Sequence, residues 1–153
     1  LAMARGRREG TTGAVLMLDL DHFKQVNDTH GHPAGDQLIR EVADLLRERS
    51  RASDVLARLG GDEFAVALPR CSLAEAHVVA EAIAAAIREH RPSGEGVEPV
   101  TASVGVAMFG DHPRTSIASV VSEADTAMYA AKDGGRDAVR VFDAVALRGD
   151  AAN

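Results

Sequence analysis

The sequence predicts an α/β (α+β) domain in which a central mixed β-sheet is flanked by helices. Strand-like and helix-like segments alternate along the chain, and one β-hairpin interrupts the alternation, which favours this class. Of the 153 residues, 46% are hydrophobic, which is sufficient for a core. The length corresponds to one domain, and no internal repeat or linker divides it.

The first half begins with a strand at residues 14–18, because an unbroken apolar run is typical of a strand buried on both faces. A short polar helix over residues 22–30 should follow, and residues 31–33 (Gly-His-Pro) should break it. A longer helix is expected over residues 34–49. Apolar residues at spacings of three and four indicate it: Leu38, Ile39, Val42, Leu45 and Leu46.

The middle of the chain predicts a hairpin. Two apolar runs, residues 55–59 and 64–68, are joined by a connection of four residues that contains two glycines. Ser72 and Glu75 then match a capping box, which predicts a helix over residues 73–90.

The last part of the chain is expected to hold a loop at residues 92–99 and a strand at 100–109, followed by a turn at 111–115. Another apolar stripe predicts a helix that begins at Ile117. The helix should end within residues 132–136, which contain glycines, because glycine is favoured at a helix C-terminus. Residues 139–142 form the last expected strand.

The ends of the chain carry weaker patterns. Residues 1–13 are expected to be the end of an upstream helix or a linker, residues 14–143 the folded domain, and residues 144–153 a disordered tail. The first residue is Leu1 and not Met, which indicates a fragment of a longer protein.

Composition excludes several classes of protein. The net charge of −6 argues against a generally basic nucleic-acid surface, so no nucleic-acid partner is expected. Cys71 is the only cysteine, which fits a reducing, cytoplasmic environment. No apolar stretch approaches the ~18 residues of a membrane span, and no signal peptide is visible; an anchor elsewhere in a longer protein stays open. Five histidines show no metal-ligand spacing and are expected at the surface: His22, His30, His77, His90 and His112.

Carboxylates are concentrated at two strand ends. Asp19 closes the first strand, and Asp62 and Glu63 lie at the hairpin tip beside Gly60 and Gly61. If the first strand lies beside the hairpin, the three carboxylates meet and need a cation to stay ionised, for which Mg²⁺ with substrate phosphates is suited. The glycines would let a ligand approach the backbone closely. Taken alone, each motif is more often an ordinary hairpin turn or strand end, and spacing cannot show that the two sites touch.

Five ordered segments resemble a known family. Residues 58–64, Arg-Leu-Gly-Gly-Asp-Glu-Phe, resemble the signature of GGDEF domains, the diguanylate cyclases. Residues 19–28, 31–36, 101–107 and 127–136 resemble further motifs of that family, so the resemblance extends from about residue 14 to residue 142.

The resemblance implies an enzyme that makes cyclic di-GMP from two GTP and releases two pyrophosphates, with a fold similar to the palm of polymerases and adenylyl cyclases. It implies Mg²⁺, or Mn²⁺ in its place, as the cofactor. It also implies an antiparallel homodimer, in which each domain contributes half of the site, and control by an upstream sensor or response domain.

Site residues are implied by the matched motifs. Asp62 would be the general base, and Asp19, Asp62, the Leu20 carbonyl and Glu63 would hold the metal. The implied substrate-binding residues are Phe23 and Lys24 (through backbone amides), Asn27 and Asp36 (guanine), His32, Gly60, Gly61, Lys132 and Arg136 (phosphates). Phe23 is also expected to be a core anchor, and Arg58 to brace the hairpin.

An Arg-x-x-Asp pair, Arg51 and Asp54, precedes Gly60 at the spacing of the family's product-inhibition site. The second arginine of that site has no clear counterpart, because Arg88 lies late on its helix. Asp137 stands where the family usually has Asn, which adds an anion beside Arg136 and could weaken its phosphate contact. The family's usual Asp-x-Leu-Thr-Gly-Leu-x-Asn-Arg-Arg opening is absent and would lie upstream of Leu1.

Two other functions stay open at this point. One is a non-catalytic module that binds GTP or cyclic di-GMP and regulates an attached phosphodiesterase domain of the EAL type. The intact Asp62 and Glu63 argue against it, because degenerate members of the family usually lose them. The other is a structural interaction module, which would leave the clustered carboxylates without a purpose.

Overall fold

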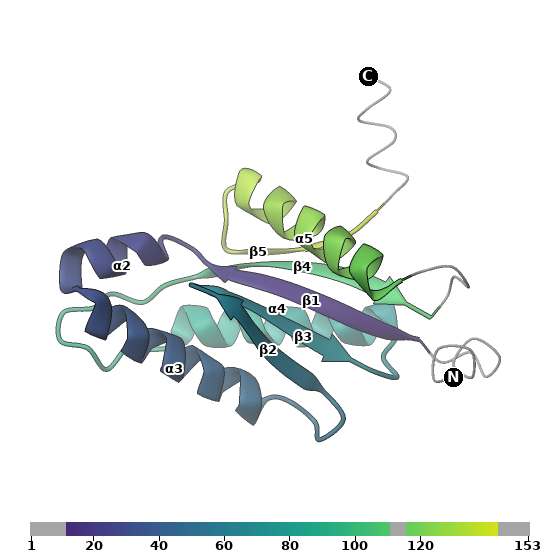
Figure 1. The fold of residues 1–153 in the computed structure, drawn as a ribbon, viewed down its shortest axis with the longest axis horizontal. Helices are drawn as coiled ribbons and strands as arrows, with labels where there is room; N and C mark the ends of the chain where they lie inside the picture. The colour runs from purple at the N-terminus through teal and green to yellow at the C-terminus, as the bar shows by residue number, and fades with distance from the viewer. Residues whose placement is uncertain (1–11, 111–115, 144–153) are drawn as a thin grey trace.

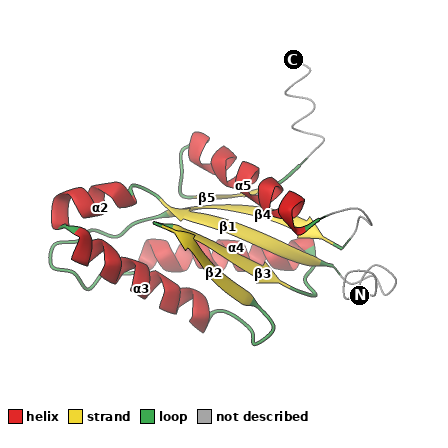
Figure 2. Cartoon of the chain, in the orientation of Figure 1, coloured by secondary structure: helices red, strands yellow, loops and turns green. Residues whose placement is uncertain are grey.

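The computed structural model describes residues 12–110 and 116–143 (Figure 1). The segments expected at residues 1–11, 111–115 and 144–153 lie outside the described residues. The elements alternate as expected (Figure 2); in chain order they are β1 (Gly13–Leu20), α2 (Phe23–His30), α3 (His32–Glu48), β2 (Val55–Gly60), β3 (Glu63–Leu68), α4 (Leu73–Glu89), β4 (Ala102–Phe109), α5 (Ile117–Asp133) and β5 (Ala138–Val141).

The five strands form one mixed sheet in the order β2-β3-β1-β4-β5, which confirms the predicted class. β1 is central and pairs antiparallel with both β3 and β4, while β4 and β5 are parallel. Every residue of β1 is buried, as an apolar run in a central strand requires. β4 is also buried on both faces over most of its length.

Helices cover both faces of the sheet, which gives three layers. Leu16 and Leu18 of β1 belong to the core beneath α3 and α4, whereas Val15 and Met17 pack with α5 on the opposite face. Figure 1 shows α5 on one side of the sheet and α3 and α4 on the other. Because successive side chains of a strand point to opposite faces, one apolar run serves both cores.

Two helix starts show how local sequence sets the boundaries. Ser72 caps α4: its hydroxyl accepts the Glu75 N–H, and the Glu75 carboxylate accepts the Ser72 N–H, which confirms the capping box. The expected break after residue 30 is confirmed, because α2 ends at His30. It is shorter than expected: α3 already begins at His32, with Pro33 in its first turn, a position where proline's missing N–H costs nothing. Gly31, with a φ of 89°, makes the whole turn between α2 and α3.

His90, expected at the surface, is half-buried. Its Nε2 lies 2.7 Å from Glu41 Oε1, which joins the end of α4 to α3. The Ser93 N–H donates to the same oxygen at 3.1 Å, and the Ser93 hydroxyl donates to Oε2. Burial raises the pKa of Glu41, but hydrogen bonds from Ser93, His90 and Gln37 outweigh it and lower the pKa to about 2.

No described helix is long and apolar enough to cross a membrane.

Candidate active site

The hairpin tip and the end of β1 lie side by side, as the sequence predicted. Asp19 is the register partner of Glu63, and the Leu20 N–H donates to the Asp62 carbonyl at 3.2 Å. β3 begins directly after Asp62, so the connection between the strands has two residues and not four. The antiparallel pairing therefore brings the carboxylates of residues 19 and 62–63 together at one end of the strands.

Asp19 is buried, with 9% of its surface exposed. Its Oδ2 accepts a hydrogen bond from Lys132 Nζ, whereas its Oδ1 is buried and has no hydrogen-bond partner among the described residues. Lys132 Nζ also lies 5.2 Å from the centre of the Tyr129 ring. An unsatisfied carboxylate oxygen inside a protein costs free energy, so Asp19 is prepared for a further positive partner.

The pKa values of Asp62 and Glu63, the two acids next to Asp19, are raised. Burial and the adjacent Asp19 carboxylate raise the pKa of Asp62 to about 6. Burial, and after it the charges of Asp125 and Asp19, raises the pKa of Glu63. Raised pKa values in an open site are typical of catalytic centres, and here burial and the neighbouring carboxylates outweigh the lowering effect of Lys132.

The donor set fits a hard cation that also binds substrate oxygens. No group of three His, Cys, Asp or Glu side chains in the described part of the chain is arranged to enclose a metal. Two carboxylates near each other, one with a buried free oxygen, are what a Mg²⁺ ion needs when phosphates and water fill its other positions. The residues present therefore fit Mg²⁺ on the condition that a nucleotide completes the site.

The two glycines of the tip leave the backbone open. A Cβ added at Gly60 or Gly61 would meet no atom within 4 Å, so the space above them is free. Both have positive φ, 140° and 47°, conformations that favour glycine. Arg58 Nε and a terminal guanidinium nitrogen donate to the Gly61 carbonyl at 3.1 and 2.8 Å, which confirms that Arg58 braces the hairpin.

A second group of expected residues lies where α2 meets α3. Phe23 is buried in the core, as expected, and Asn27 Oδ1 is buried without a hydrogen-bond partner among the described residues. Gly35 lies against it: a Cβ there would come within 1.8 Å of Asn27 Oδ1. His32 and Asp36 are exposed at the start of α3. Asn27 thus offers a free acceptor beside the helix that carries Asp36.

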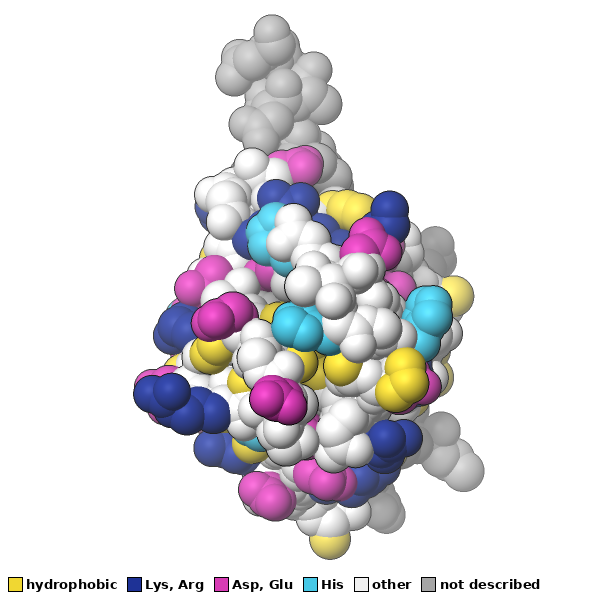
Figure 3. Space-filling model, turned by 90° about the vertical axis from the view of Figure 1, so that its left-hand side faces the viewer, with side chains coloured by type: hydrophobic (Ala, Val, Ile, Leu, Met, Phe, Trp, Pro, Cys, Tyr) yellow, Lys and Arg dark blue, Asp and Glu magenta, His cyan; other side chains and the backbone are white. Residues whose placement is uncertain are grey.

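Two expected phosphate contacts lie at exposed positions. Lys24, in the first turn of α2, is exposed. That helix has no side-chain cap and no acidic residue in its first turn. No side chain of that turn therefore accepts a hydrogen bond from its N-terminal N–H groups. Arg136 is exposed and follows α5, with a φ of 66°. Figure 3 shows acidic and basic side chains interspersed on the face that α2 helps to form, with histidines among them.

The comparisons with known proteins agree with this geometry. A family model described as "Diguanylate cyclase, GGDEF domain" matches residues 1–138. The chain belongs to the GGDEF domain family. It is 47% identical over 131 residues to the probable diguanylate cyclase DgcE of Escherichia coli strain K12, an alignment that covers 85% of this chain and 12% of DgcE.

Solved GGDEF domains share the fold. The GGDEF domain of DgcB from Caulobacter crescentus, in complex with c-di-GMP, superposes with a TM-score of 0.81 at 37% identity and covers 92% of this chain and 84% of that one. The active GGEEF domain of a diguanylate cyclase from Vibrio cholerae superposes with a TM-score of 0.84 at 30% identity. That match covers 93% of this chain and 90% of the other. This chain spans between 12% and 31% of the length of the first curated relatives that it matches.

The Arg-x-x-Asp pair of this GGDEF domain lies at the far end of β2 from the tip. Six residues separate the two ends, about 20 Å at the usual rise per residue of a strand. The Asp54 side chain is only 4% exposed and accepts hydrogen bonds from the Arg51 N–H and guanidinium, while Arg51 also donates to the Pro69 carbonyl at 3.2 Å. The two residues are therefore already paired with each other.

Sequence reasoning missed several residues of this GGDEF domain. Asp125 influences Glu63 from α5, and nothing in the local sequence of α5 indicates it. Asp137 was expected to add negative charge beside Arg136, but its carboxylate binds Arg88 at 2.9 to 3.0 Å. That pairing engages Arg88, which lies too late on its helix to be a clear counterpart of the second inhibitory arginine.

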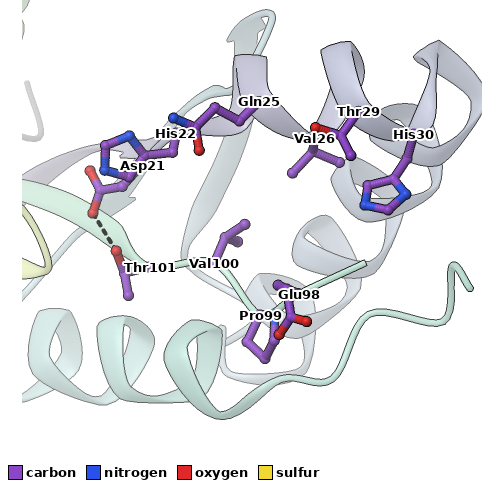
Figure 4. A pocket seen from close by; sticks show the side chains of 10 residues that line it. All are labelled: Asp21, His22, Gln25, Val26, Thr29, His30, Glu98, Pro99, Val100 and Thr101. Atoms are coloured by element: carbon purple, nitrogen blue, oxygen red, sulfur yellow. Dashed lines mark hydrogen bonds between the residues drawn. The ribbon is translucent and has the colours of Figure 1, made fainter. Parts of the chain in front are cut away.

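A cavity of about 360 Å³ lies beside the site, between α2 and the segment that precedes β4 (Figure 4). Val26 and Val100 contribute apolar walls, and His22 and His30 stand at its two ends. None of the residues expected from the family motifs to bind metal or substrate lines it. Asp21, one of its lining residues, connects it to the strand end that carries Asp19.

Proposed function

We propose that this GGDEF domain is a diguanylate cyclase that condenses two GTP into cyclic di-GMP. The observation that supports it best is the convergence of Asp19, Asp62 and Lys132 at the open tip of the hairpin. A domain with only a structural role would have no use for a buried carboxylate oxygen without a partner.

In the proposed reaction, the 3′-hydroxyl oxygen of each GTP attacks the α-phosphorus of the other. The bond from that phosphorus to the bridging oxygen breaks, and pyrophosphate leaves with the electron pair. Asp62, at the hairpin tip, takes the hydroxyl proton as general base. One domain holds one such site, so two domains must face each other as a homodimer.

The proposed cofactor is Mg²⁺, with Mn²⁺ as a substitute. Asp19, Asp62 and the Leu20 carbonyl would hold it, with Glu63 close by. When bound, the ion neutralises charge on the phosphates as the leaving group departs. The buried free oxygen of Asp19 supports this assignment, because it offers a ligand that no described residue satisfies.

We propose that the phosphates lie between α5 and the start of α2. Lys132 and Arg136 supply positive charge, and the backbone N–H groups of Phe23 and Lys24 at the helix N-terminus donate hydrogen bonds to anionic oxygens. The open backbone at the hairpin glycines lets the nucleotide approach without a side chain in its way. Positioning and charge stabilisation are most of what phosphoryl transfer requires of a protein.

The base is proposed to lie between α2 and α3. Asn27 Oδ1 is an acceptor without a partner among the described residues, and guanine offers donors at N1–H and at its 2-amino group. Asp36 would accept from the same edge, and His32 would line the pocket. Adenine lacks both donors, so the site should prefer GTP to ATP.

Product inhibition is proposed to act through Arg51 and Asp54. Because they lie about 20 Å from the tip along β2, cyclic di-GMP bound there could not displace GTP directly. It would act by holding two domains apart, and it would have to replace the hydrogen bonds that Arg51 now makes to Asp54 and to Pro69. The much greater length of the curated relatives fits control by an upstream sensor or response domain.

The decisive experiment incubates the domain with GTP and Mg²⁺ and separates the products by chromatography. Cyclic di-GMP should form with the parent and with the control Glu95→Gln, an exposed acid in the loop before β4, and should be absent with Asp62→Asn. The circular dichroism spectrum of Asp62→Asn should match the parent. If the parent binds GTP and forms no product, the domain is a regulatory binding module of the kind that accompanies phosphodiesterase domains.

A further inference from the structure

The connection between α5 and β5 has an unusual backbone. Arg136 and Asp137 have φ values of 66° and 46°, so two consecutive residues with side chains adopt the left-handed conformation, directly after Gly135 at 118°. This conformation is unfavourable for residues other than glycine, and less so for Asp or Asn. Conformations of this kind persist only where the surrounding structure holds them, and they cluster at functional sites.

The inner side of this turn is held by a buried carboxylate. The Asp137 N–H donates to Asp21 Oδ2 at 3.0 Å. The Thr101 hydroxyl donates to the same oxygen at 2.7 Å, an interaction drawn in Figure 4, and the Ser103 hydroxyl donates to Oδ1 at 2.7 Å. Asp21 is 3% exposed. Hydrogen bonds to a buried charge are strong, so Asp21 ties the turn to the ends of β1 and β4.

The outer side is held by α4. Arg88 Nε lies 3.0 Å from both carboxylate oxygens of Asp137, and a terminal nitrogen of the same guanidinium lies 2.9 Å from Oδ1. Both side chains are more than a third exposed, and exposed ion pairs add little to stability. The value of this pair lies in its geometry: a planar guanidinium that contacts both oxygens fixes the direction of the Asp137 side chain.

Arg136 directly precedes Asp137, the residue that makes both attachments. Its neighbour Asp137 is fixed through its N–H to Asp21 and through its carboxylate to Arg88, so the direction in which the Arg136 side chain leaves the turn is fixed as well. Its own N–H donates to the Ala131 carbonyl at 2.9 Å, which attaches it to the end of α5. Lys132, the partner of Asp19, is four residues earlier.

We propose that Asp21 and the Arg88–Asp137 pair are positioning residues that direct Arg136 toward the triphosphate. The proposal rests on the proposed function, in which Arg136 binds phosphate. In this proposal Asp137 does not weaken the phosphate contact of Arg136. Its carboxylate points away to α4, and its backbone holds the phosphate-binding turn.

The test is a double-mutant cycle measured by binding. Calorimetry with the α,β-methylene analogue of GTP, which cannot release pyrophosphate, gives the affinity of the parent, Arg88→Gln, Asp137→Asn and Arg136→Gln. Asn keeps both the N–H and the tolerance for positive φ, so Asp137→Asn removes only the ion pair. Glu89→Gln, a charge change next to Arg88, is the matched control.

We expect Arg88→Gln and Asp137→Asn each to weaken binding by about tenfold, with unchanged melting temperatures. Either change made in the Arg136→Gln background should have no further effect, because the residues act through that arginine. In steady state, KM for GTP should rise while kcat stays within about twofold. Amide exchange at Asp137 should become faster in Asp21→Asn, which weakens the acceptor.

Unchanged affinity in Arg88→Gln and Asp137→Asn, or the same loss with Arg136 already removed, would overturn the proposal. A parent that binds the analogue but makes no cyclic di-GMP would refute the proposed function only, since the binding cycle still measures the positioning. A parent that does not bind the analogue would refute both.

Discussion

Replacing Gly105 with alanine tests how closely α5 is seated on the sheet. Gly105 lies in the middle of β4, and a Cβ there would come within 2.0 Å of the Ala124 carbonyl oxygen and 2.3 Å of the Met128 backbone nitrogen. Both atoms belong to the backbone of α5, so no side chain can rotate to make room. Ordinary contact begins near 3.4 Å, which means that the helix must move by about 1.4 Å.

Such overpacking typically costs 1–3 kcal/mol and sometimes more; contact with backbone atoms places Gly105→Ala at the upper end, about 3 kcal/mol. For a domain of this size, that corresponds to a decrease of roughly 6–12 °C in melting temperature. The chain has no tryptophan, so thermal unfolding should be followed by far-ultraviolet circular dichroism. A displaced α5 should also disturb the contact between Lys132 and Asp19, which begins at the end of this helix.

Gly134→Ala is the matched control. A Cβ there would approach the end of the flexible Arg140 side chain at 2.7 Å and the Ala130 carbonyl at 3.2 Å, and its φ of −82° is accessible to alanine. We expect its stability to change by less than about 1 kcal/mol. If Gly105→Ala melts within 2 °C of the parent, a limit well below the roughly 6 °C expected from the overpacking cost, the close seating of α5 on β4 is refuted.

Three further predictions concern other parts of the domain. Because the folded-state pKa of Glu41 is lowered to about 2, its ionised form stabilises the fold above the unfolded-state pKa of about 4.3, and this contribution is lost as the pH falls toward 2. The difference in urea midpoint between the parent and Glu41→Gln should therefore narrow as the pH falls over that range. A difference that stays constant would contradict the prediction. Gly35→Ala should displace Asn27 and weaken binding of the GTP analogue by about 1–3 kcal/mol while leaving the melting temperature nearly unchanged; equal affinities by calorimetry would remove Asn27 from the base site. Arg51→Ala should abolish inhibition by added cyclic di-GMP and keep the initial rate within about twofold, consistent with a coupling of ~1–3 kcal/mol; a variant as strongly inhibited as the parent would show that Arg51 is only a surface charge.

Much of the fold is determined by patterns that act over a few residues. The apolar run ending at Asp19, the capping box at Ser72 and the two apolar runs around Gly60 each determine a local structure through burial, hydrogen bonding or backbone freedom, and the structure confirms all three. Boundaries are less accurate: the break between the first two helices was expected to include Pro33, yet Pro33 lies in the first turn of α3, because a proline there costs no hydrogen bond. Whether a proline ends a helix or begins one depends on the residues that come after it.

The candidate site divides in the same way. The acids at the hairpin tip were recognisable because they lie directly at the ends of strands whose pairing can be inferred, and the five motifs identify the family. The contacts that hold Asp137, next to Arg136, were not, because Asp21, Arg88 and Asp137 are far apart along the chain, and only the packing of α4 and α5 on opposite faces of one sheet brings them together. Short-range order depends on neighbouring residues, so the sequence by itself determined the elements and the acids at the hairpin tip. The contacts between side chains of distant elements depend on how those elements pack, so only the tertiary structure decided that Asp137 contacts both Asp21 and Arg88.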